Sequence, residues 1–281
     1  MSGAFVEVSW VLEHLNDPSV RIVDARSMPH GASVAGARTG AEQYAAGHIP
    51  GAVQLDYAHD LADPATPYAT RVAPADLFAK TMAACGIGDD TTIVAYDDGD
   101  VPYAARLLWM SRYYGHDAVA IVAGGFKAWC AAGYPVTTDV PSYPPATFVP
   151  HERPELRATR EDVLAIARGQ SAAQLLETQR DKTYGMRERD IAGAKRLSGN
   201  KLLLDSNGGR VAPRAEIDAL VDGLGLDRSK RTILTCGSGV SASGSYVALL
   251  EAGFTDLAVY DGSWLEWEHD GLPTVPKSAG A

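Results

Sequence analysis

Short apolar runs rich in β-branched residues alternate along the chain with longer stretches of helical character. The strand-like runs occupy residues 20–26, 92–97, 118–125, 173–179, 233–236 and 257–262. Stretches such as Pro74–Cys85 and Pro213–Leu224 lie between them and have the composition of amphipathic helices. Short apolar strands separated by helices predict a parallel sheet with helices on both faces.

The pattern occurs twice, which predicts two domains of the same fold. In the first half Gly47-His48-Ile49-Pro50-Gly51 follows the first strand, and residues 191–194 hold the same place in the second half. Prolines are dense between the halves, which predicts a stiff, extended connector. We therefore predict a first domain at 1–140, a linker at 141–155 and a second domain at 156–281.

One cysteine follows a strand-like run directly. Residues 232–235 lead into Cys236, and a helix-like stretch, Ser243–Ala252, comes soon after. Backbone N–H groups of the intervening loop and the positive end of the helix favour negative charge on the sulfur. We therefore expect a nucleophilic thiolate with a pKa below the ordinary value of about 8.5. The residues expected to surround it are Gly237, Ser238, Gly239, Val240, Ser241 and Ala242.

Ligands of open α/β sheets bind beyond the carboxyl ends of the strands, where Cys236 is expected. The matching position in the first half is Tyr96 or Asp97, depending on a one-residue choice of register. Neither is a thiol, so we expect chemistry in the second domain alone, with the substrate in the cleft between the domains. Cysteine-dependent phosphatases need an arginine six residues after the nucleophile, and Ala242 in that place excludes them.

Composition narrows the class of protein further. The net charge of −10 argues against nucleic-acid and anionic-membrane partners. The three cysteines form no CxxC pair and have no metal-ligand spacing, and so sparse a number suits a reducing compartment. The sequence shows no signal peptide and no apolar run that could span a bilayer. We expect a cytoplasmic protein without a metal site.

Several motifs together resemble the tandem-rhodanese family of sulfurtransferases, and most closely its members that use mercaptopyruvate. The motifs are Asp24-Ala25-Arg26, Gly47-His48-Ile49-Pro50-Gly51-Ala52, Tyr96-Asp97-Asp98-Gly99, Cys236-Gly237-Ser238-Gly239-Val240-Ser241 and Tyr260-Asp261-Gly262-Ser263-Trp264-Leu265-Glu266-Trp267. The resemblance covers nearly the whole chain. It implies an α/β fold of two rhodanese-like domains, each a mainly parallel sheet with helices on both faces.

The resemblance also implies the reaction. Cys236 would take a sulfane sulfur from 3-mercaptopyruvate or thiosulfate as a persulfide and pass it to a thiophilic acceptor such as cyanide or a thiol. No cofactor is needed, and a thioredoxin-like reductant is among the acceptors that the family implies. The alternative is a pathway-specific sulfur carrier, loaded by one protein and delivering to another.

The loop after Cys236 and one histidine of the first half bear on the choice of sulfur donor. Relatives that prefer thiosulfate carry two cations beside the cysteine, whereas Gly237 and Ser238 are neutral here and resemble the mercaptopyruvate type. The Ser238 hydroxyl either relays a proton or holds the donor, or it only caps the helix. His48 matches a histidine proposed to work with that serine. The alternative for His48 is a structural role, bonding backbone within its turn.

The second domain departs from the family around the expected donor pocket. Glu177-Thr178-Gln179 replaces the usual Asp-Ala-Arg, and Thr183 stands where the family has the arginine that grips the substrate carboxylate. A carboxylate is bound well by a bidentate guanidinium. The nearby cations that could substitute are Arg180, Lys182, Arg187 and Arg189. For each of them, the alternative is a solvated charged loop.

Overall fold

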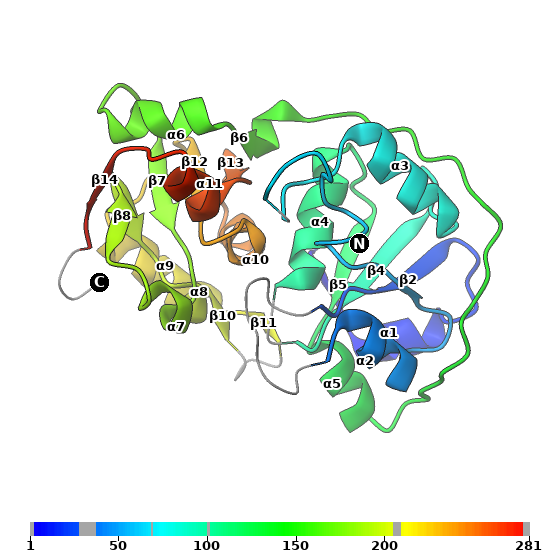
Figure 1. Ribbon diagram of the computed structural model, residues 1–281. Helices are drawn as coiled ribbons and strands as arrows, with labels where there is room; N and C mark the ends of the chain where they lie inside the picture. Colours follow the sequence, from blue (N-terminus) through cyan, green and yellow to red (C-terminus); the bar gives the residue numbers. More distant parts are fainter. Residues whose placement is uncertain (1–2, 28–37, 69, 100–101, 205–208, 278–281) are drawn as a thin grey trace. The chain divides into compact units, whose positions relative to one another are not determined.

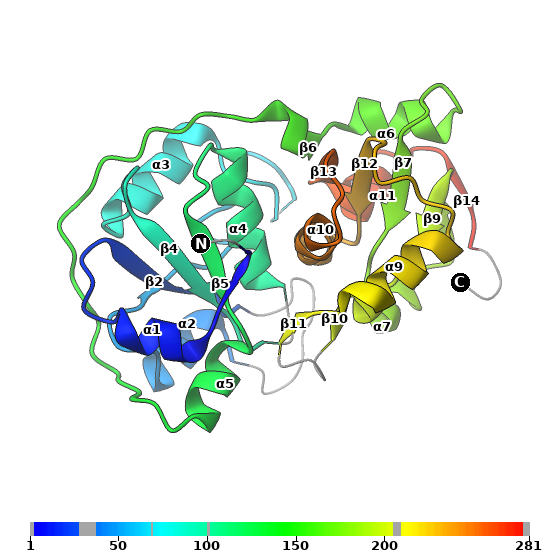
Figure 2. The same ribbon diagram turned by 180° about the vertical axis from the view of Figure 1, so that it is seen from behind.

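The computed structural model describes residues 3–27, 38–68, 70–99, 102–204 and 209–277 (Figures 1 and 2). The chain divides into two compact units. Unit 1 comprises residues 1–153 with 205–210, and unit 2 comprises residues 154–204 with 211–281. Among the described residues, no helix is both long and apolar enough to cross a bilayer.

Unit 1 is built on a five-stranded sheet in the order β1-β5-β4-β2-β3, and every pairing in it is parallel. Its strands are β1 (Phe5–Val6), β2 (Val20–Asp24), β3 (Val53–Gln54), β4 (Thr92–Tyr96) and β5 (Val119–Val122). Its helices are α1 (Val8–Glu13), α2 (Gly40–Ala46), α3 (Ala75–Ala84), α4 (Tyr103–Tyr113) and α5 (Gly125–Ala131).

Unit 2 has a sheet of the same design, in the order β6-β13-β12-β7-β9 and again parallel throughout. Its strands are β6 (Arg157–Ala158), β7 (Gln174–Glu177), β9 (Ala194–Arg196), β12 (Thr232–Thr235) and β13 (Leu257–Tyr260). Its helices are η1 (Pro154–Leu156, a 3-10 turn), α6 (Arg160–Ala167), α7 (Asp181–Tyr184), α8 (Gly199–Leu202), α9 (Arg214–Gly223), α10 (Val240–Glu251) and α11 (Ser263–His269). The remaining short strands are β8 (Arg189–Ile191) with β14 (Thr274–Pro276), and β10 (Leu203–Leu204) with β11 (Arg210–Val211).

Alternation of side chains along the strands explains why helices cover both faces, as the sequence predicted. In unit 1, Ile22 and Val94 point to one face and pack with Val11 of α1 and Trp129 of α5. In Figure 1, α1, α2 and α5 gather on one side of this sheet and α3 and α4 on the other. In unit 2, α6 and α11 contribute to one core cluster, whereas α10 packs on β12 and β13 and also contacts α9.

The proline-rich segment before unit 2 is extended, and much of it packs along unit 1. Residues 139–153 contain no helix or strand. The Tyr143 hydroxyl donates to the Gly51 carbonyl at 2.7 Å, and the Arg21 guanidinium lies 3.3 Å from the centroid of the Tyr143 ring. Phe148 is buried and packs edge-on against Phe78. These aromatic side chains anchor the segment to the surface of unit 1.

Candidate active site

The carboxyl ends of two neighbouring strands define the site in unit 2. β12 and β7 pair so that Thr235 lies opposite Glu177, and Cys236 is the next residue after β12. In unit 1 the equivalent pairing sets Tyr96 opposite Asp24. Tyr96 therefore corresponds to Thr235, and Asp97 corresponds to Cys236. The register that the sequence left open is decided in favour of Asp97.

The loop after Cys236 folds its backbone around the sulfur. The Gly239 N–H donates to Cys236 Sγ at 3.1 Å, and α10 begins at the next residue. Gly239 has φ 82°, a left-handed conformation that glycine adopts without strain. The loop that the sequence singled out thus forms one side of the sulfur environment.

A serine from α11 forms another part of this environment. The Cys236 backbone N–H donates to Ser263 Oγ at 3.2 Å, and the Ser263 hydroxyl donates to the Tyr260 carbonyl at 2.8 Å. Ser263 is fully buried and has φ 49°, which is uncommon for a residue other than glycine. Its counterpart in unit 1 is Gly125, at φ 55°. The strained serine therefore holds the cysteine backbone in place.

The electrostatics at the sulfur differ from the sequence-based expectation. Burial raises the pKa of the Cys236 thiol, and the nearby Glu177 carboxylate raises it further. The N–H groups of Ser238, Gly239 and Ala242 act in the opposite direction, but they do not outweigh burial. The predicted lowering of this pKa is wrong. The sequence identifies the N–H donors of the loop, but it does not show that the thiol is buried or that Glu177 lies near it.

Unit 1 has a carboxylate where unit 2 has the thiol. The Asp97 side chain accepts hydrogen bonds from the Gly99 N–H at 2.7 Å and from the Ala104 N–H at 3.1 Å. These donors come from the loop and helix that follow β4, as the donors to Cys236 follow β12. The loop of unit 1 therefore holds a fixed anion of its own, and it offers no nucleophilic sulfur.

His48, a candidate for substrate binding, is fully buried in unit 1. Its Nδ1 lies 2.9 Å from the Tyr44 carbonyl oxygen and its Nε2 lies 3.1 Å from the Asp139 carbonyl oxygen. Its ring also stacks on the Tyr44 ring at 3.7 Å. Both ring nitrogens are thus engaged by backbone, and this environment matches the structural alternative for His48.

Two of the four candidate cations are held by other groups of unit 2. Arg187 Nη2 donates to Glu177 at 2.6 Å and to Asp190 at 3.0 Å, and its side chain is 6% exposed. Arg189 donates to the hydroxyl of Thr274 at 2.5 Å and to its carbonyl at 2.9 Å, in the β8–β14 ribbon. The structure thus places Arg187 at the carboxyl end of β7 and Arg189 in the ribbon.

The other two candidates lie at the start of α7 and within it. Arg180 is the residue before this helix, and its side chain lies next to Gly199. Lys182 is exposed on α7. Thr183 is exposed as well, and its hydroxyl donates to the Arg180 carbonyl at 3.1 Å. At the position that the family gives to an arginine, this chain therefore has an exposed threonine bonded to its own helical turn.

Sequence reasoning missed three residues that shape the site. From the sequence, Glu177 and Gln179 stood out only as departures from a family motif, and Ser263 appeared only as a member of such a motif. Gln179 lies against Gly237, so that a Cβ on Gly237 would come within 3.1 Å of Gln179 Nε2. Gln179 Oε1 is buried without a hydrogen-bond partner among the described residues. The available signal was the position of each residue at or just beyond the carboxyl end of a strand-like run.

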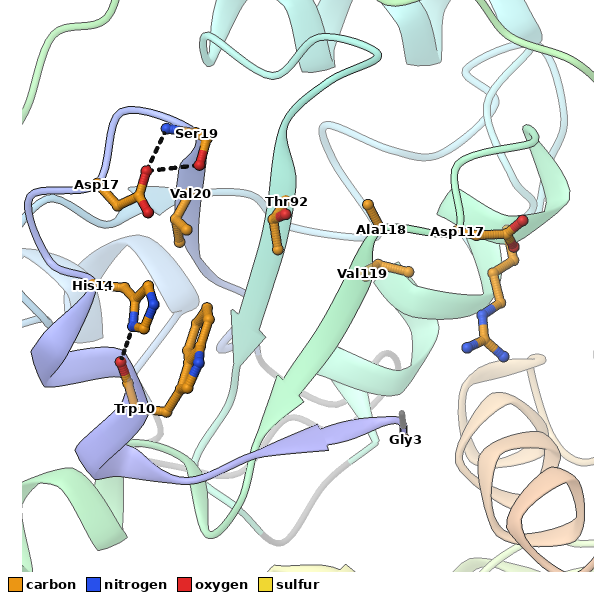
Figure 3. Close-up of a pocket in the computed structure, with 11 residues that line it drawn as sticks. Gly3, Trp10, His14, Asp17, Ser19, Val20, Thr92, Asp117, Ala118 and Val119 are labelled. Carbon is orange, nitrogen blue, oxygen red and sulfur yellow. Dashed lines mark hydrogen bonds between the residues drawn. The ribbon is translucent and has the colours of Figure 1, made fainter. Parts of the chain in front are cut away.

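A pocket of about 310 Å³ lies at the other end of the strands of the unit 1 sheet. It is lined by the first residues of three strands, Val20, Thr92 and Val119, and by the stacked rings of Trp10 and His14 (Figure 3). It therefore lies at the amino ends of the strands, away from Asp97. Within the described part of the chain, no group of three or more His, Cys, Asp or Glu side chains is placed to hold a metal ion.

Comparisons with known proteins agree with this architecture. The family model for the rhodanese-like domain matches residues 7–132 and 159–270. The sulfur carrier protein TtuD of Thermus thermophilus is 32% identical, over 98% of this chain and 96% of its own length. Thiosulfate sulfurtransferase of Bos taurus is 31% identical, over 99% of this chain and 96% of its own length. The crystal structure of SseA from Escherichia coli, a 3-mercaptopyruvate sulfotransferase, has a TM-score of 0.84 at 29% identity and covers 94% of this chain and 99% of its own.

Proposed function

The chain belongs to the rhodanese family, with two rhodanese-like domains in tandem, and from this premise we propose a sulfurtransferase whose nucleophile is Cys236. The observation that carries the proposal is the position of this thiol. It directly follows β12, and its sulfur accepts the Gly239 N–H at 3.1 Å in a loop of small residues. We assign catalysis to residues 156–281 and a non-catalytic role to residues 1–140, where Asp97 replaces the cysteine.

The proposed donor is 3-mercaptopyruvate, with thiosulfate as the second choice. The Cys236 thiolate attacks the donor sulfur, so that an S–S bond forms and the carbon–sulfur bond of the donor breaks. The electron pair of that bond goes to the donor carbon, which takes up one proton and leaves as pyruvate. Splitting the transfer into two steps is the usual advantage of a covalent intermediate.

The second step returns Cys236 to its starting state. A thiol or cyanide acceptor attacks the outer sulfur of the persulfide, the S–S bond breaks, and its electron pair returns to Cys236. The N–H groups of Gly239 and its neighbours stabilise negative charge on the sulfur as it develops. The reaction needs no external oxidant or cofactor. A thioredoxin-like dithiol is an acceptor of suitable chemistry.

A sulfur carrier is the second candidate function, and one observation favours it. A small anionic donor needs a cation to hold its carboxylate. Arg187 and Arg189, two of the four candidates, already bond to groups of unit 2, and the loop positions Gly237 and Ser238 are neutral. A persulfide delivered by a partner protein would need no such cation in this chain. TtuD, one of the similar proteins, is itself named a sulfur carrier.

Intact-protein mass spectrometry separates these functions. The reduced protein is incubated with 3-mercaptopyruvate, with thiosulfate, or with a cysteine desulfurase and cysteine. We expect 3-mercaptopyruvate to add one sulfur that cyanide removes, and we expect C236S to gain none. The matched controls C85S and C130S should load like the wild type. Loading by the desulfurase alone would favour the carrier, and loading of C236S would refute the proposed nucleophile.

A further inference from the structure

Unit 1 shows how an arginine serves the carboxyl end of this sheet. The Asp24 carboxylate accepts hydrogen bonds from the Arg26 backbone N–H at 3.0 Å, from Arg26 Nη2 at 2.5 Å and from the Tyr96 hydroxyl at 2.7 Å. The side chains of Asp24 and Arg26 are 0% and 4% exposed. The Arg26 guanidinium carbon lies 4.1 Å from the centroid of the Phe126 ring. Arg26 thus neutralises a carboxylate that the fold buries.

Unit 2 keeps the carboxylate and loses the arginine two residues later. Glu177 ends β7 as Asp24 ends β2, and its side chain is 2% exposed. The Gln179 backbone N–H donates to Glu177 Oε1 at 2.8 Å, which reproduces the backbone contact of unit 1. The Gln179 amide, however, carries no charge. A buried carboxylate is strongly destabilising unless a cation compensates it.

Arg187 supplies the cation from a different part of the chain. Its Nη2 donates to Glu177 Oε2 at 2.6 Å, and its guanidinium carbon lies 4.4 Å from the centroid of the Trp264 ring. It reaches Glu177 from the turn after α7, ten residues along the chain, whereas Arg26 lies two residues after its partner.

The aromatic rings show that the two guanidinium groups occupy the same place. The backbone N–H of Trp264 donates to the Cys236 carbonyl at 3.0 Å, and the backbone N–H of Phe126 donates to the Asp97 carbonyl at 2.8 Å. Since Cys236 and Asp97 are equivalent, Trp264 and Phe126 are equivalent as well. Each guanidinium therefore lies between its carboxylate and the corresponding aromatic ring of α11 or α5.

We propose that Arg187 is a positioning residue for Cys236, because it holds and neutralises the Glu177 carboxylate at the end of β7, the strand that pairs with β12 directly before Cys236. The inference deepens the proposed function and rests on it, since Arg187 matters to catalysis only if Cys236 reacts as a thiolate. The Glu177 carboxylate opposes ionisation of Cys236 by raising the pKa of the thiol. Arg187 reduces that opposition through its ion pair with Glu177.

Three ionisable groups around this pair, those of Arg196, Tyr184 and Asp261, have partners of their own. Arg196 donates to the Glu177 backbone carbonyl at 3.1 Å and to the Asp181 carboxylate at 2.7 Å. Beyond β7, the ionisable groups on elements packed against the site include Tyr184, whose hydroxyl donates to Asp190 at 2.6 Å, and Asp261 at the end of β13, which pairs with Arg157 at 3.4 Å. The buried Glu266 of α11 and the exposed Asp181 and Lys182 of α7 are further ionisable groups on these elements. Among the described residues, Arg187 is the charged side chain that hydrogen-bonds the Glu177 carboxylate.

This assignment gives Arg187 a role other than gripping a donor. A guanidinium that already serves two carboxylates, Glu177 and Asp190, has its charge compensated within unit 2. A third carboxylate, from the donor, would meet two like charges at that place. The role of Arg187 that these ion pairs support is toward the nucleophile.

The test measures the rate at which iodoacetamide alkylates Cys236 between pH 6 and pH 11, by mass analysis of the Cys236 peptide in a C85S/C130S background. We expect R187Q to raise the pH midpoint by about one unit, because a nearby uncompensated carboxylate disfavours the thiolate. This corresponds to about tenfold slower alkylation below the midpoint. R187K keeps the charge and should stay within about threefold of the wild-type rate.

Two further variants separate charge from folding. E177Q should lower the midpoint, and E177Q/R187Q should reverse the shift caused by R187Q. A loosened fold would change the rate at all pH values without moving the midpoint. The matched control is R231Q, because Arg231 also pairs with a carboxylate, that of Asp256 at 2.7 Å. Arg231 precedes β12, however, and lies five residues from Cys236, which is about 16 Å along the strand. It should leave the midpoint unchanged.

The inference is overturned if R187Q and E177Q both leave the midpoint where it is, or if R231Q moves it equally. If R187Q does not fold, E177Q alone decides. Alkylation requires no sulfur donor, so its outcome is independent of whether the protein transfers sulfur. Persulfide loading of the wild type, measured separately, tests the proposed function.

Discussion

Replacing Ser263 by alanine tests how the cysteine backbone is held. The Ser263 hydroxyl is the acceptor for the Cys236 N–H at 3.2 Å, and both residues are almost wholly buried. In S263A that N–H loses its partner in a place that is 0–1% exposed. A buried donor left without a partner destabilises a protein by about 1–3 kcal/mol.

The same substitution removes a second hydrogen bond, from the Ser263 hydroxyl to the Tyr260 carbonyl at 2.8 Å. A hydrogen bond of this kind contributes about 0.5–1.5 kcal/mol. We therefore expect S263A to destabilise unit 2 by about 2–4 kcal/mol in total. S263G loses both hydrogen bonds too, but glycine relieves the strain at φ 49°. That relief, about 1–2 kcal/mol, exceeds the chain entropy of glycine, about 0.5–1 kcal/mol. S263G should therefore be the milder variant.

Hydrogen exchange resolves the effect by region. The amides of β12 should lose protection equivalent to the predicted 2–4 kcal/mol, while those of β4 in unit 1 serve as an internal reference. The matched control is S243A. The Ser243 hydroxyl is equally buried and donates to the Gly239 carbonyl at 2.8 Å, and without it that carbonyl still accepts the Ser243 N–H at 3.1 Å. S243A should lose about 1 kcal/mol or less. If S263A and S243A were equally stable, or if S263A stayed within about 0.5 kcal/mol of the wild type, the reasoning would be refuted.

Two more predictions concern the sulfur and its counterpart in unit 1. Because burial and Glu177 raise the pKa of Cys236, its alkylation rate should still rise about tenfold per pH unit at the pKa of an ordinary thiol, about 8.5. A plateau below pH 8 would contradict this. G125A should destabilise unit 1 by about 2–5 kcal/mol, because a Cβ at φ 55° would lie 2.2 Å from the Asp97 carbonyl oxygen. Unchanged exchange of β4 in G125A would show that the loop adapts.

The folding units were accessible from the sequence because their signals are local. The runs at 92–97 and 233–236 became β4 and β12, and the helix-like stretch at Pro213–Leu224 became α9 with one residue fewer at each end. Strand and helix preferences of this kind depend on neighbours along the chain. The repeat then predicted two equivalent sheets, and both have the same strand order.

The loop after Cys236 was accessible for the same reason. A strand that ends at Thr235, small residues, and a helix that begins at Val240 define the backbone around the sulfur without any long-range contact. Charge was the part that this local pattern could not determine. The carboxylate beside the sulfur comes from β7, about sixty residues earlier, and only the pairing of β7 with β12 places it there.

What the sequence by itself determined about this protein is the order of its elements and its repetition, and it also pointed to Cys236, the proposed nucleophile. Only the tertiary structure decided that Asp97 is the counterpart of Cys236, and that Arg187 takes the place of an arginine absent at Gln179. It also decided the direction of the Cys236 pKa shift. The physical reason is that propensities act along the chain, whereas burial and charge act through space between residues that folding brings together.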